Sequence, residues 1–270
     1  MRIMKLLSGA ELAGYIKERQ ARQVRALRQA HGVVPRLAIV QTIDDPVIDT
    51  YVRLKRRYGD DVLIEVDDHK VAQADAARLI DQLNHDDSVQ AIIIQLPLAD
   101  PAMTDETINS VAPHKDVDGL GLRAEYDPAT ALAINWLCAG YNIDLSTQRI
   151  VVIGQGRLVG APLTAMWRNS GYDVTTADRT TADLATLCRD ATLIVAGTGS
   201  PGLVTSDIVR PDAILIDAGT ASEGGKIVGD IAPELYDRTD LTITPQRGGV
   251  GPLTVAALFD NVIQAASRTT

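Results

Sequence analysis

Apolar runs alternate with stretches of helical periodicity along nearly the whole chain. In the first half, the runs suited to β-strands cover residues 36–43, 61–66 and 89–98. The helical patterns of the same half cover residues 9–30, 46–58, 71–84 and about 102–111. This alternation is typical of the α/β class, in which a helix connects each strand to the next one in the sheet.

The second half continues the alternation with runs that are rich in Val, Ile and Leu. Its predicted strands cover residues 149–154, 173–177, 192–198, 213–219 and 241–244. Near-continuous apolar runs are expected of parallel strands that helices cover on both faces. Pro128 and the helical stretch "TALAINWLCAGYNI" separate the two sets of strands. We therefore predict two α/β domains that flank a cleft.

Composition narrows the class of protein without changing this architecture. The 270 residues are 46% hydrophobic and 23% charged, an ordinary mixture for a globular protein. The net charge of −9 disfavours nucleic acid or an anionic membrane as the main partner. No apolar window approaches the roughly 18 residues of a membrane span, so we expect a soluble protein. Cys138 and Cys188 lie in apolar helical patterns, and we expect reduced, buried thiols in a cytoplasmic protein.

Candidate chemistry begins in "RIVVIGQGRLVGAPL", which is a strand, a glycine turn and then a helix. Gly154, Gly156 and Gly160 form G-x-G-x-x-x-G, one residue longer than the commonest dinucleotide fingerprint. Such glycines let the backbone approach a pyrophosphate, which then faces amide N–H groups at a helix N-terminus. A purely structural turn would use the same glycines. The flanking strand and helix favour a Rossmann-like dinucleotide-binding domain.

The next strand, "DVTTA", ends at Asp178 and Arg179, where a dinucleotide fold recognises the adenosine ribose. Asp178 could accept a hydrogen bond from a 2′-OH, which would indicate NAD. Arg179 could instead pair with a 2′-phosphate, which would indicate NADP. Two solvated loop charges would give the same pattern. We expect NADP, with NAD as the alternative.

In the first half, "YVRLKRRYG" places Tyr51 and Lys55 one helical turn apart, on one face of a helix. An ordinary basic helix face would produce the same spacing. A Tyr-x-x-x-Lys pair also occurs in short-chain dehydrogenases, but there it follows the nucleotide fold, whereas here it comes well before it. That analogy therefore fails on order.

Two further motifs of the first half carry polar side chains. "IIIQLPL" puts Gln95 at the carboxyl end of a buried strand, where polar side chains commonly face a ligand crevice in open α/β sheets. "PHKDVDGLG" supplies Lys115, Asp116 and Asp118. A calcium loop would need an oxygen ligand where Leu120 stands, so we reject calcium and predict no metal site. A plain turn is the remaining alternative.

Taken together, these segments resemble the bifunctional methylenetetrahydrofolate dehydrogenase/cyclohydrolase family. The matching motifs, in chain order, are "YVRLK", "QLPL", "PHKDVDG", "GQGRLVGAP", "VAGTGSPGLV", "AILIDAG", "VGDI" and "TPQRGGVGPLT". Single pieces are unspecific, but the ordered set is specific and covers most of the chain. The resemblance implies a folate-binding catalytic domain over residues 1–125, completed by a C-terminal helix over 252–270, and a nucleotide-binding domain over 126–251.

The resemblance also implies roles for single residues. The family's catalytic lysine falls on Lys55, with Tyr51 and Gln95 as its supporting residues. Its pterin-anchoring aspartate falls on Asp118, and Tyr51, Gly248 and Gly249 would also contact the folate. The implied cofactor-binding residues are Gly154, Gln155, Gly156, Arg157, Gly160, Arg179, Thr198, Gly199 and Thr130.

The implied activity has two steps in one-carbon metabolism, upstream of purine biosynthesis. 5,10-Methylenetetrahydrofolate is oxidised by NAD(P)⁺ to 5,10-methenyltetrahydrofolate, which is then hydrolysed to 10-formyltetrahydrofolate. Hydride transfer requires mainly orientation, whereas hydrolysis requires a proton shuttle such as a lysine of lowered pKa. A homodimer through the nucleotide domains is also implied. Two alternatives stay open: another two-domain NAD(P) dehydrogenase of the shikimate type, and a paralogue that binds folate or nucleotide without turnover.

Before the glycine turn, the chain departs from the family pattern at three places. Ile48 stands where the family has a serine, three positions before the tyrosine. "TALA" keeps Thr130 but loses the proline and glycine of the family's T-P-x-G. The stretch between Gly119 and Pro128 is shorter than usual.

Two further departures lie in the glycine turn and in the late loop, and together the departures border both ligands. Gln155 and Gly156 replace an arginine and a serine of the family's fingerprint, so that Arg179 would have to supply the contact with a 2′-phosphate. In the late loop "TPQRGGVGPLT", Gln246 and Arg247 replace a valine and a proline. Arg247 could bind an anionic part of a ligand or point to solvent.

Overall fold

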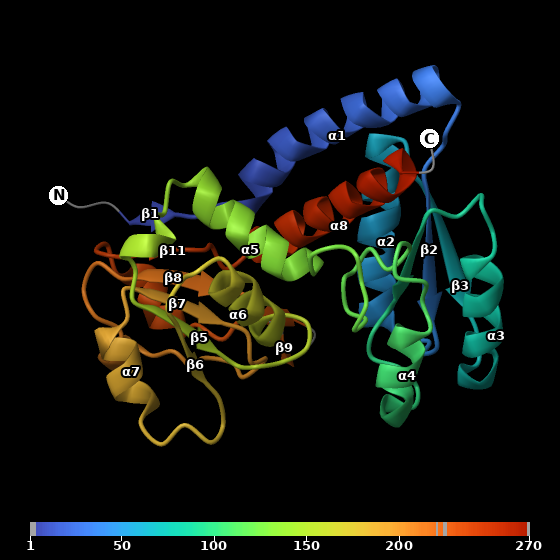
Figure 1. Cartoon of the computed structure of the whole chain (residues 1–270). Helices are drawn as coiled ribbons and strands as arrows, with labels where there is room; N and C mark the ends of the chain where they lie inside the picture. Colours follow the sequence, from blue (N-terminus) through green and yellow to red (C-terminus); the bar gives the residue numbers. More distant parts are fainter. Residues whose placement is uncertain (1–3, 220, 224–225, 269–270) are drawn as a thin grey trace. The chain divides into compact units, whose positions relative to one another are not determined.

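The computed structural model describes residues 4–219, 221–223 and 226–268. Their contacts divide the chain into two units, each built around its own parallel sheet (Figure 1). The described residues of 4–13 and 130–254 form the six-stranded unit, and those of 14–129 and 255–268 form the three-stranded unit. The α/β class with two domains is thus confirmed. Residues 1–3 of the predicted first domain, and 269–270 of the predicted last helix, lie outside the described residues.

In the three-stranded unit, the strands lie in the order β3–β2–β4 and are all parallel. The strands are β2 (Arg36–Gln41), β3 (Glu65–Lys70) and β4 (Ala91–Ile94). The helices of the unit are α2 (Pro46–Val62), α3 (Gln73–Asn84) and α4 (Thr104–Asn109), with the short η1 (Pro101–Met103) before α4. α2 connects β2 to β3 and α3 connects β3 to β4, which is the βαβ connection that parallel strands require.

Two long helices complete this unit, and each also extends into the other one. These are α1 (Gly9–His31) and α8 (Val250–Ser267). The ring of Tyr58 on α2 lies against Phe259 on α8, with 4.9 Å between ring centroids. The Tyr58 hydroxyl donates to Oε1 of buried Gln20 on α1, and Gln20 Nε2 donates to the carbonyl of Ala256 on α8. This buried network fixes α2 against α1 and α8.

In the six-stranded unit, the strands lie in the order β1–β11–β8–β7–β5–β6, and all are parallel. The strands are β1 (Lys5–Leu6), β5 (Ile150–Ile153), β6 (Val174–Ala177), β7 (Leu193–Ala196), β8 (Ile214–Asp217) and β11 (Thr242–Ile243). The helices are α5 (Ala129–Gly140), α6 (Gly160–Asn169) and α7 (Leu184–Asp190), with the short η2 (Leu145–Thr147), η3 (Ser206–Ile208) and η4 (Pro233–Asp237). β9 (Ala221–Glu223) and β10 (Lys226–Val228) form a separate antiparallel pair.

One predicted strand, over residues 61–66, is wrong in its position. Helix α2 continues to Val62, and Leu63 ends it in the left-handed conformation with φ of 65°. Val62 and Ile64 are buried at this helix end, which explains the apolar run. The strand itself covers 65–70 and lies at the edge of its sheet, where charged side chains are expected.

Lys5 and Leu6 belong to the six-stranded sheet, whereas the family resemblance implies that they lie in the folate-binding domain. Lys5 pairs with Thr242 and Leu6 pairs with Ile243, so that β1 extends the sheet beyond β11. A two-residue strand gives no recognisable period along the sequence, which is why the pattern did not predict it. None of the described helices is long and apolar enough to cross a membrane.

Candidate functional site

Helix α2 carries the first two predicted site residues. It begins where the carboxylate of Asp45 accepts hydrogen bonds from the N–H groups of Val47 and Ile48, which satisfies donors that the first turn leaves unpaired. Ile48, in the position of the family's serine, is buried in the core. Tyr51 and Lys55 follow one turn apart, and both are half-buried.

Lys55 and Gln95 lie together, as a pair of adjacent side chains. The Lys55 ammonium donates a 2.7 Å hydrogen bond to Oε1 of Gln95. Gln95 follows directly after β4, and its N–H still donates to the Val40 carbonyl of β2 at 2.8 Å. Its Nε2 donates to the Leu96 carbonyl at 3.1 Å, which directs Oε1 toward the lysine. The sheet therefore holds the backbone of Gln95, and the local hydrogen bond orients its amide.

Asp118 interacts electrostatically with this pair. Desolvation raises the pKa of Asp118 to about 6; the Lys55 ammonium opposes the rise and the Asp116 carboxylate adds to it. Desolvation also lowers the pKa of Lys55, and the charge of Asp118 opposes that lowering. The two pKa values thus move toward each other, which is typical of sites that transfer protons near neutral pH. Lys55 and Gln95 are hydrogen-bonded and the charge of Asp118 acts on Lys55, so we treat the three residues as one cluster, with Tyr51 one helical turn from the lysine.

Lys115, next to this cluster in the sequence, has a structural role. Its side chain is buried, and its ammonium donates to the carbonyls of Leu83 and Asp86 at 2.9 and 2.8 Å. Desolvation lowers the pKa of Lys115, while the carboxylates of Asp86 and Asp87 oppose the shift. The lysine thereby ties the chain before Asp118 to the end of α3.

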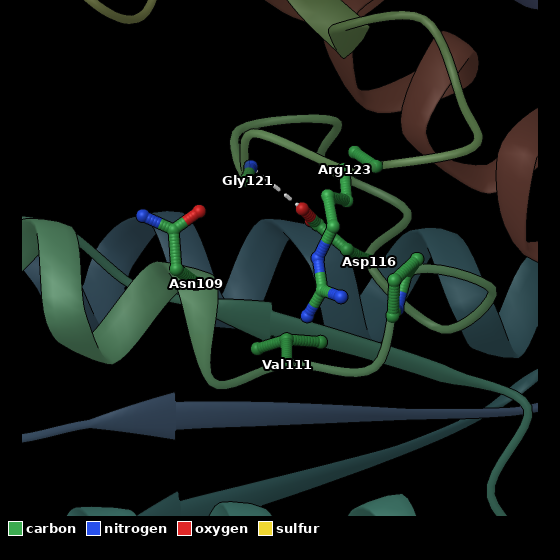
Figure 2. Close-up of a pocket in the computed structure, with 7 residues that line it drawn as sticks. Asn109, Val111, Asp116, Gly121 and Arg123 are labelled. Carbon is green, nitrogen blue, oxygen red and sulfur yellow. Dashed lines mark hydrogen bonds between the residues drawn. The ribbon is translucent and has the colours of Figure 1, made fainter.

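Asp116 closes the turn that follows. Its carboxylate accepts hydrogen bonds from the N–H groups of Gly119 and Gly121, at 3.2 and 2.7 Å. A small polar hollow lies beside this carboxylate (Figure 2). It is lined by Asn109, Val111, Pro113, Asp116, Gly121, Arg123 and Ala124. Lys55 and Gln95 do not line this hollow, so it is separate from their pair.

The shortened loop between Gly119 and Pro128 is closed by the last helix. Asn261 of α8 is buried, and its Nδ2 donates to the carbonyls of Val117 and Asp127, at 2.9 and 3.0 Å. One amide group thus holds both ends of the loop. The loop keeps a fixed base next to Asp118 despite its reduced length.

In the six-stranded unit, two glycines of the predicted turn are required by the turn itself. Gly154 has φ of 89°, and a Cβ there would lie 2.7 Å from the Gly197 carbonyl oxygen. A Cβ on Gly160 would lie 1.7 Å from the Gly154 carbonyl oxygen. Gly156 differs, because a Cβ there would meet nothing within 4 Å. Its small size therefore leaves open space above the turn, as a pyrophosphate would require.

Polar side chains of both charges surround the turn and the end of the neighbouring strand. The Gln155 amide donates to the Gly154 carbonyl at 3.1 Å, and Arg157 is exposed. At the end of β6, Oδ1 of Asp178 accepts from the N–H and the hydroxyl of Thr180, at 2.8 and 2.6 Å. These hydrogen bonds lower the pKa of Asp178. Arg179, beside it, is exposed.

Thr198 and Gly199 form a second turn beside the glycine turn. A Cβ on Gly154 would lie 2.9 Å from Cγ2 of Thr198, and Gly199 has φ of 69°. The N–H and the hydroxyl of Thr198 both donate to Oδ2 of Asp230, the hydroxyl at 2.9 Å. Asp230 was not among the predicted site residues. The motif "VGDI" was its only signal in the sequence.

The glycines of the late loop close against the start of α1. Gly248 has φ of 80°, and its carbonyl accepts a 2.9 Å hydrogen bond from the N–H of Ala10. A Cβ on Gly9 would lie 1.9 Å from the Gly249 carbonyl oxygen. Glycines are therefore needed where the late loop packs closely against the start of α1 within the six-stranded unit.

Three further predicted or altered positions, Thr130, Gln246 and Arg247, take part in none of the contacts described above. Thr130 lies in the first turn of α5 and is half-buried, so "TALA" forms a helix without its proline and glycine. Gln246 and Arg247 are both exposed at the surface of the late loop. An exposed Arg247 is compatible with both roles expected for it, binding an anionic part of a ligand or pointing to solvent.

Comparison with known proteins gives one family for both halves of the chain. Residues 7–118 match the family model described as tetrahydrofolate dehydrogenase/cyclohydrolase, catalytic domain. Residues 128–270 match the model described as tetrahydrofolate dehydrogenase/cyclohydrolase, NAD(P)-binding domain. A Campylobacter jejuni protein named bifunctional protein FolD is 36% identical over 280 residues, which cover 98% of this chain and 99% of that protein.

Solved structures agree with these matches. The crystal structure of FolD from Campylobacter jejuni has a TM-score of 0.93 at 34% identity, covering 99% of this chain and 100% of that one. The Trypanosoma brucei dehydrogenase-cyclohydrolase, complexed with NADP and an inhibitor, has a TM-score of 0.92 at 27% identity, covering 99% of both chains. A shikimate 5-dehydrogenase from Thermus thermophilus reaches a TM-score of 0.53 at 14% identity, covering 87% of this chain and 100% of that one, and shares the fold alone. This chain belongs to the tetrahydrofolate dehydrogenase/cyclohydrolase family.

Proposed function

We propose that this protein oxidises 5,10-methylenetetrahydrofolate to 5,10-methenyltetrahydrofolate with NADP⁺, and hydrolyses that product to 10-formyltetrahydrofolate. The observation that carries the proposal is the cluster of Lys55, Gln95 and Asp118, in a chain whose halves match the catalytic and NAD(P)-binding domains of one family. The comparisons support this function and give the shikimate-type alternative no support beyond the shared fold.

In the hydrolysis, Lys55 acts as the proton shuttle. Desolvation lowers the pKa of Lys55 and so favours its neutral form. In the hydrolysis this amine accepts a proton from the water that attacks the methenyl carbon. Gln95 holds the resulting ammonium through Oε1, at the distance found in the structure. The hydroxyl proton of the adduct passes to the folate nitrogen whose bond to carbon breaks. Tyr51, one turn from the lysine, supports its position.

In the oxidation, the protein supplies orientation rather than acid–base chemistry. The folate nitrogens provide the electronic push, and NADP, when bound, supplies the hydride acceptor. Asp118 accepts hydrogen bonds from the amino and ring N–H groups of the pterin, which fixes the plane of the ring. This role needs the ionised carboxylate, and a pKa of about 6 leaves Asp118 ionised at neutral pH. Gly248 and Gly249 complete the folate contacts.

The residues of the six-stranded unit fit NADP. The open space at Gly156 and the helix that begins at Gly160 suit a pyrophosphate. Asp178 is engaged by Thr180, whereas exposed Arg179 is available for a 2′-phosphate. Arg179 would then replace the arginine and serine that the family fingerprint has at the positions of Gln155 and Gly156. The remaining proposed cofactor-binding residues are Arg157, Thr198, Gly199 and Thr130.

The protein is further proposed to act in the cytoplasm as a homodimer, with folate as its partner molecule and no nucleic acid or membrane partner. Cys138 and Cys188 are both free and buried, which suits a reducing compartment. The dimer, formed through the nucleotide domains, rests on the family resemblance. Sedimentation of the purified protein would test it.

A single assay tests the function. The purified protein is mixed with methylenetetrahydrofolate and either NADP⁺ or NAD⁺, and the formation and decay of the methenyl product are followed separately. We expect turnover with NADP⁺, and hydrolysis of methenyltetrahydrofolate supplied alone without any dinucleotide. If neither cofactor supports turnover but folate or NADPH still binds, the protein is a non-catalytic binding protein rather than an enzyme.

A further inference from the structure

We propose that Asp230 is a positioning residue of the dinucleotide site, which fixes the Thr198 turn against the glycine turn at Gly154. The proposal rests on the dehydrogenase function proposed above and adds a residue to its cofactor site. Asp230 has no exposed surface. A buried carboxylate is costly unless hydrogen bonds satisfy it. Those of Asp230 fall on Oδ2, whereas its Oδ1 is buried without a hydrogen-bond partner within the described residues. The bonds to Oδ2 therefore indicate what Asp230 holds in place.

One oxygen of Asp230 holds the Thr198 turn. Oδ2 accepts from both the N–H and the hydroxyl of Thr198. The Thr198 hydroxyl oxygen in turn accepts from the N–H of Ser200 at 3.0 Å. A single carboxylate oxygen thus defines the conformation of residues 198–200.

Asp230 is itself anchored to the sheet. Its N–H and that of Ile231 each donate to a carboxylate oxygen of Asp217, the last residue of β8, at 3.1 Å. The Asp230 carbonyl accepts from the N–H of Val204 at 2.9 Å. The carboxyl group also packs against Gly219, where a Cβ would lie 2.2 Å from it. Asp230 therefore has a fixed position from which to hold another segment.

The turn of residues 198–200 directly contacts the glycine turn at Gly154. A Cβ on Gly154 would lie 2.9 Å from Cγ2 of Thr198 and 2.7 Å from the Gly197 carbonyl oxygen. A Cβ on Gly197 would lie 2.9 Å from a methyl group of Val159. Asp217 thus holds Asp230, Asp230 holds Thr198, and Thr198 packs against Gly154 of the glycine turn. Loosening this arrangement would lower the affinity for the dinucleotide, because a binding site that is not held in its bound shape must be ordered by the ligand.

The bifunctional chain offers an internal control for this proposal. The hydrolysis depends on Lys55 and Gln95 in the three-stranded unit and needs no dinucleotide. A positioning role for Asp230 predicts a selective effect on NADP⁺, whereas a general loss of folding would lower both activities together. The two activities therefore distinguish the two explanations within one sample.

The experiment compares wild type with Asp230→Asn and Asp230→Leu. We expect Asp230→Leu to raise the KM for NADP⁺ and the Kd for NADPH by about tenfold or more, as loss of hydrogen bonds to a charged group implies. Asp230→Asn keeps one acceptor oxygen and should show a smaller rise. The KM for the folate and the rate of methenyltetrahydrofolate hydrolysis should change by less than about twofold, since the three-stranded unit is untouched.

Thr198→Val tests the same contact from the other side, because it removes the hydroxyl and keeps the N–H and the branched shape. It should raise the KM for NADP⁺ in wild type, and less so in the Asp230→Leu background. Asp240→Asn, which breaks an ion pair with Arg238 in the same unit, is the matched acid control. Thr164→Val is the matched threonine control; its buried hydroxyl has no hydrogen-bond partner within the described residues.

Unchanged NADP⁺ affinity in Asp230→Leu would overturn the proposal, and so would equal losses in both activities. If Asp230→Leu does not fold, the double-mutant cycle of Asp230→Asn with Thr198→Val takes its place, and additive effects would contradict the contact. NADPH affinity, read from the cofactor's fluorescence, needs no turnover. A wild-type protein without either activity would therefore refute the proposed function while the role of Asp230 was still tested.

Discussion

The ammonium of Lys55 and the side-chain oxygen of Gln95 lie 2.7 Å apart, although 40 positions separate the two residues in the chain. Helix α2 supplies the lysine, and the end of β4 supplies the amide. Neither residue is chemically unusual by itself. Together with Asp118, they form a site in which a lysine of lowered pKa faces an acceptor that can hold its charged form.

Replacing this lysine should abolish most of the hydrolysis. Lys55→Ala removes the proton shuttle, and we expect the rate of methenyltetrahydrofolate hydrolysis to fall by roughly a hundredfold or more. The decay of methenyltetrahydrofolate absorbance measures this rate. Lys70→Ala is the control, because Lys70 is exposed and pairs with Asp44 and Asp49 at the surface. Hydrolysis that survives in Lys55→Ala at the wild-type rate would remove Lys55 from the mechanism.

Folate binding should depend on pH through Asp118. Its carboxyl group has a pKa of about 6 and is protonated below that value, where it can no longer accept two N–H groups of the pterin. We expect the KM for methylenetetrahydrofolate to rise as the pH falls through about 6, with little change above it. Asp118→Asn should show a high KM at every pH, without this inflection. An inflection that persists in the variant would assign it to another group.

The raised pKa of Asp118 should also make the stability of the fold depend on pH. The folded-state pKa of Asp118 lies above the ordinary value of 3.8. Its favourable contribution is therefore fully present below about pH 4 and is lost as the pH rises through about 6. Urea unfolding of wild type and Asp118→Asn at both ends of this window should show the variant gaining stability relative to wild type as the pH rises. The opposite trend would mean that Asp118 is stabilised as a carboxylate.

Two glycines of the nucleotide turn should respond differently to alanine. Gly160→Ala places a Cβ 1.7 Å from the Gly154 carbonyl oxygen, so we expect a loss of stability of about 2 kcal/mol or more together with weaker NADPH binding. In Gly156→Ala the new Cβ meets no protein atom within 4 Å, so its free energy of unfolding should stay within about 0.5 kcal/mol of the wild-type value. This variant should nevertheless bind NADPH more weakly. Thermal unfolding and NADPH titration separate the two effects. Wild-type NADPH affinity in Gly156→Ala would show that the space above the turn is not used by the cofactor.

Arg179 should determine the preference for NADP over NAD. Arg179→Ala removes the cation proposed to pair with the 2′-phosphate, and we expect kcat/KM with NADP⁺ to fall about tenfold or more while that with NAD⁺ changes little. Arg189→Ala, in α7 of the same unit, serves as the control. Steady-state kinetics with both dinucleotides provide the comparison. Equal losses with the two cofactors would assign Arg179 to a part of the site that both share.

Features that depend on local pattern could be predicted from the sequence. The apolar run that ends in Gln95 is a buried strand, and its polar terminal residue lies at the carboxyl end of the sheet as expected. The spacing of Tyr51 and Lys55 gave their helix correctly. The glycine pattern between an apolar run and a helical period predicted the strand–turn–helix form of the nucleotide turn correctly. Of its glycines, Gly160 is small because of a local neighbour, the Gly154 carbonyl, whereas Gly154 is small because of the distant Gly197. The roles and domain bounds assigned from the resemblance stay predictions.

Features that depend on distant contacts could not be predicted in this way. Asp230 interacts with Thr198 across 32 positions, and nothing in its immediate sequence indicates that partner. Gly9 is small because the carbonyl of Gly249 approaches it from the other end of the chain. Strand β3 was misplaced because an edge strand of charged residues has no apolar period, whereas the helix end before it has an apolar run.

The pairing of β1 with β11, and of α8 with α2, also constrains how the protein can be made. Each unit combines an early segment of this sequence with a late one, so neither unit is complete before residue 254 has been translated. A gene fragment for residues 14–129 alone would encode Tyr58 without Phe259, and would leave one side of α2 without its cover. We therefore expect single substitutions, rather than a division of the gene, to separate the two activities.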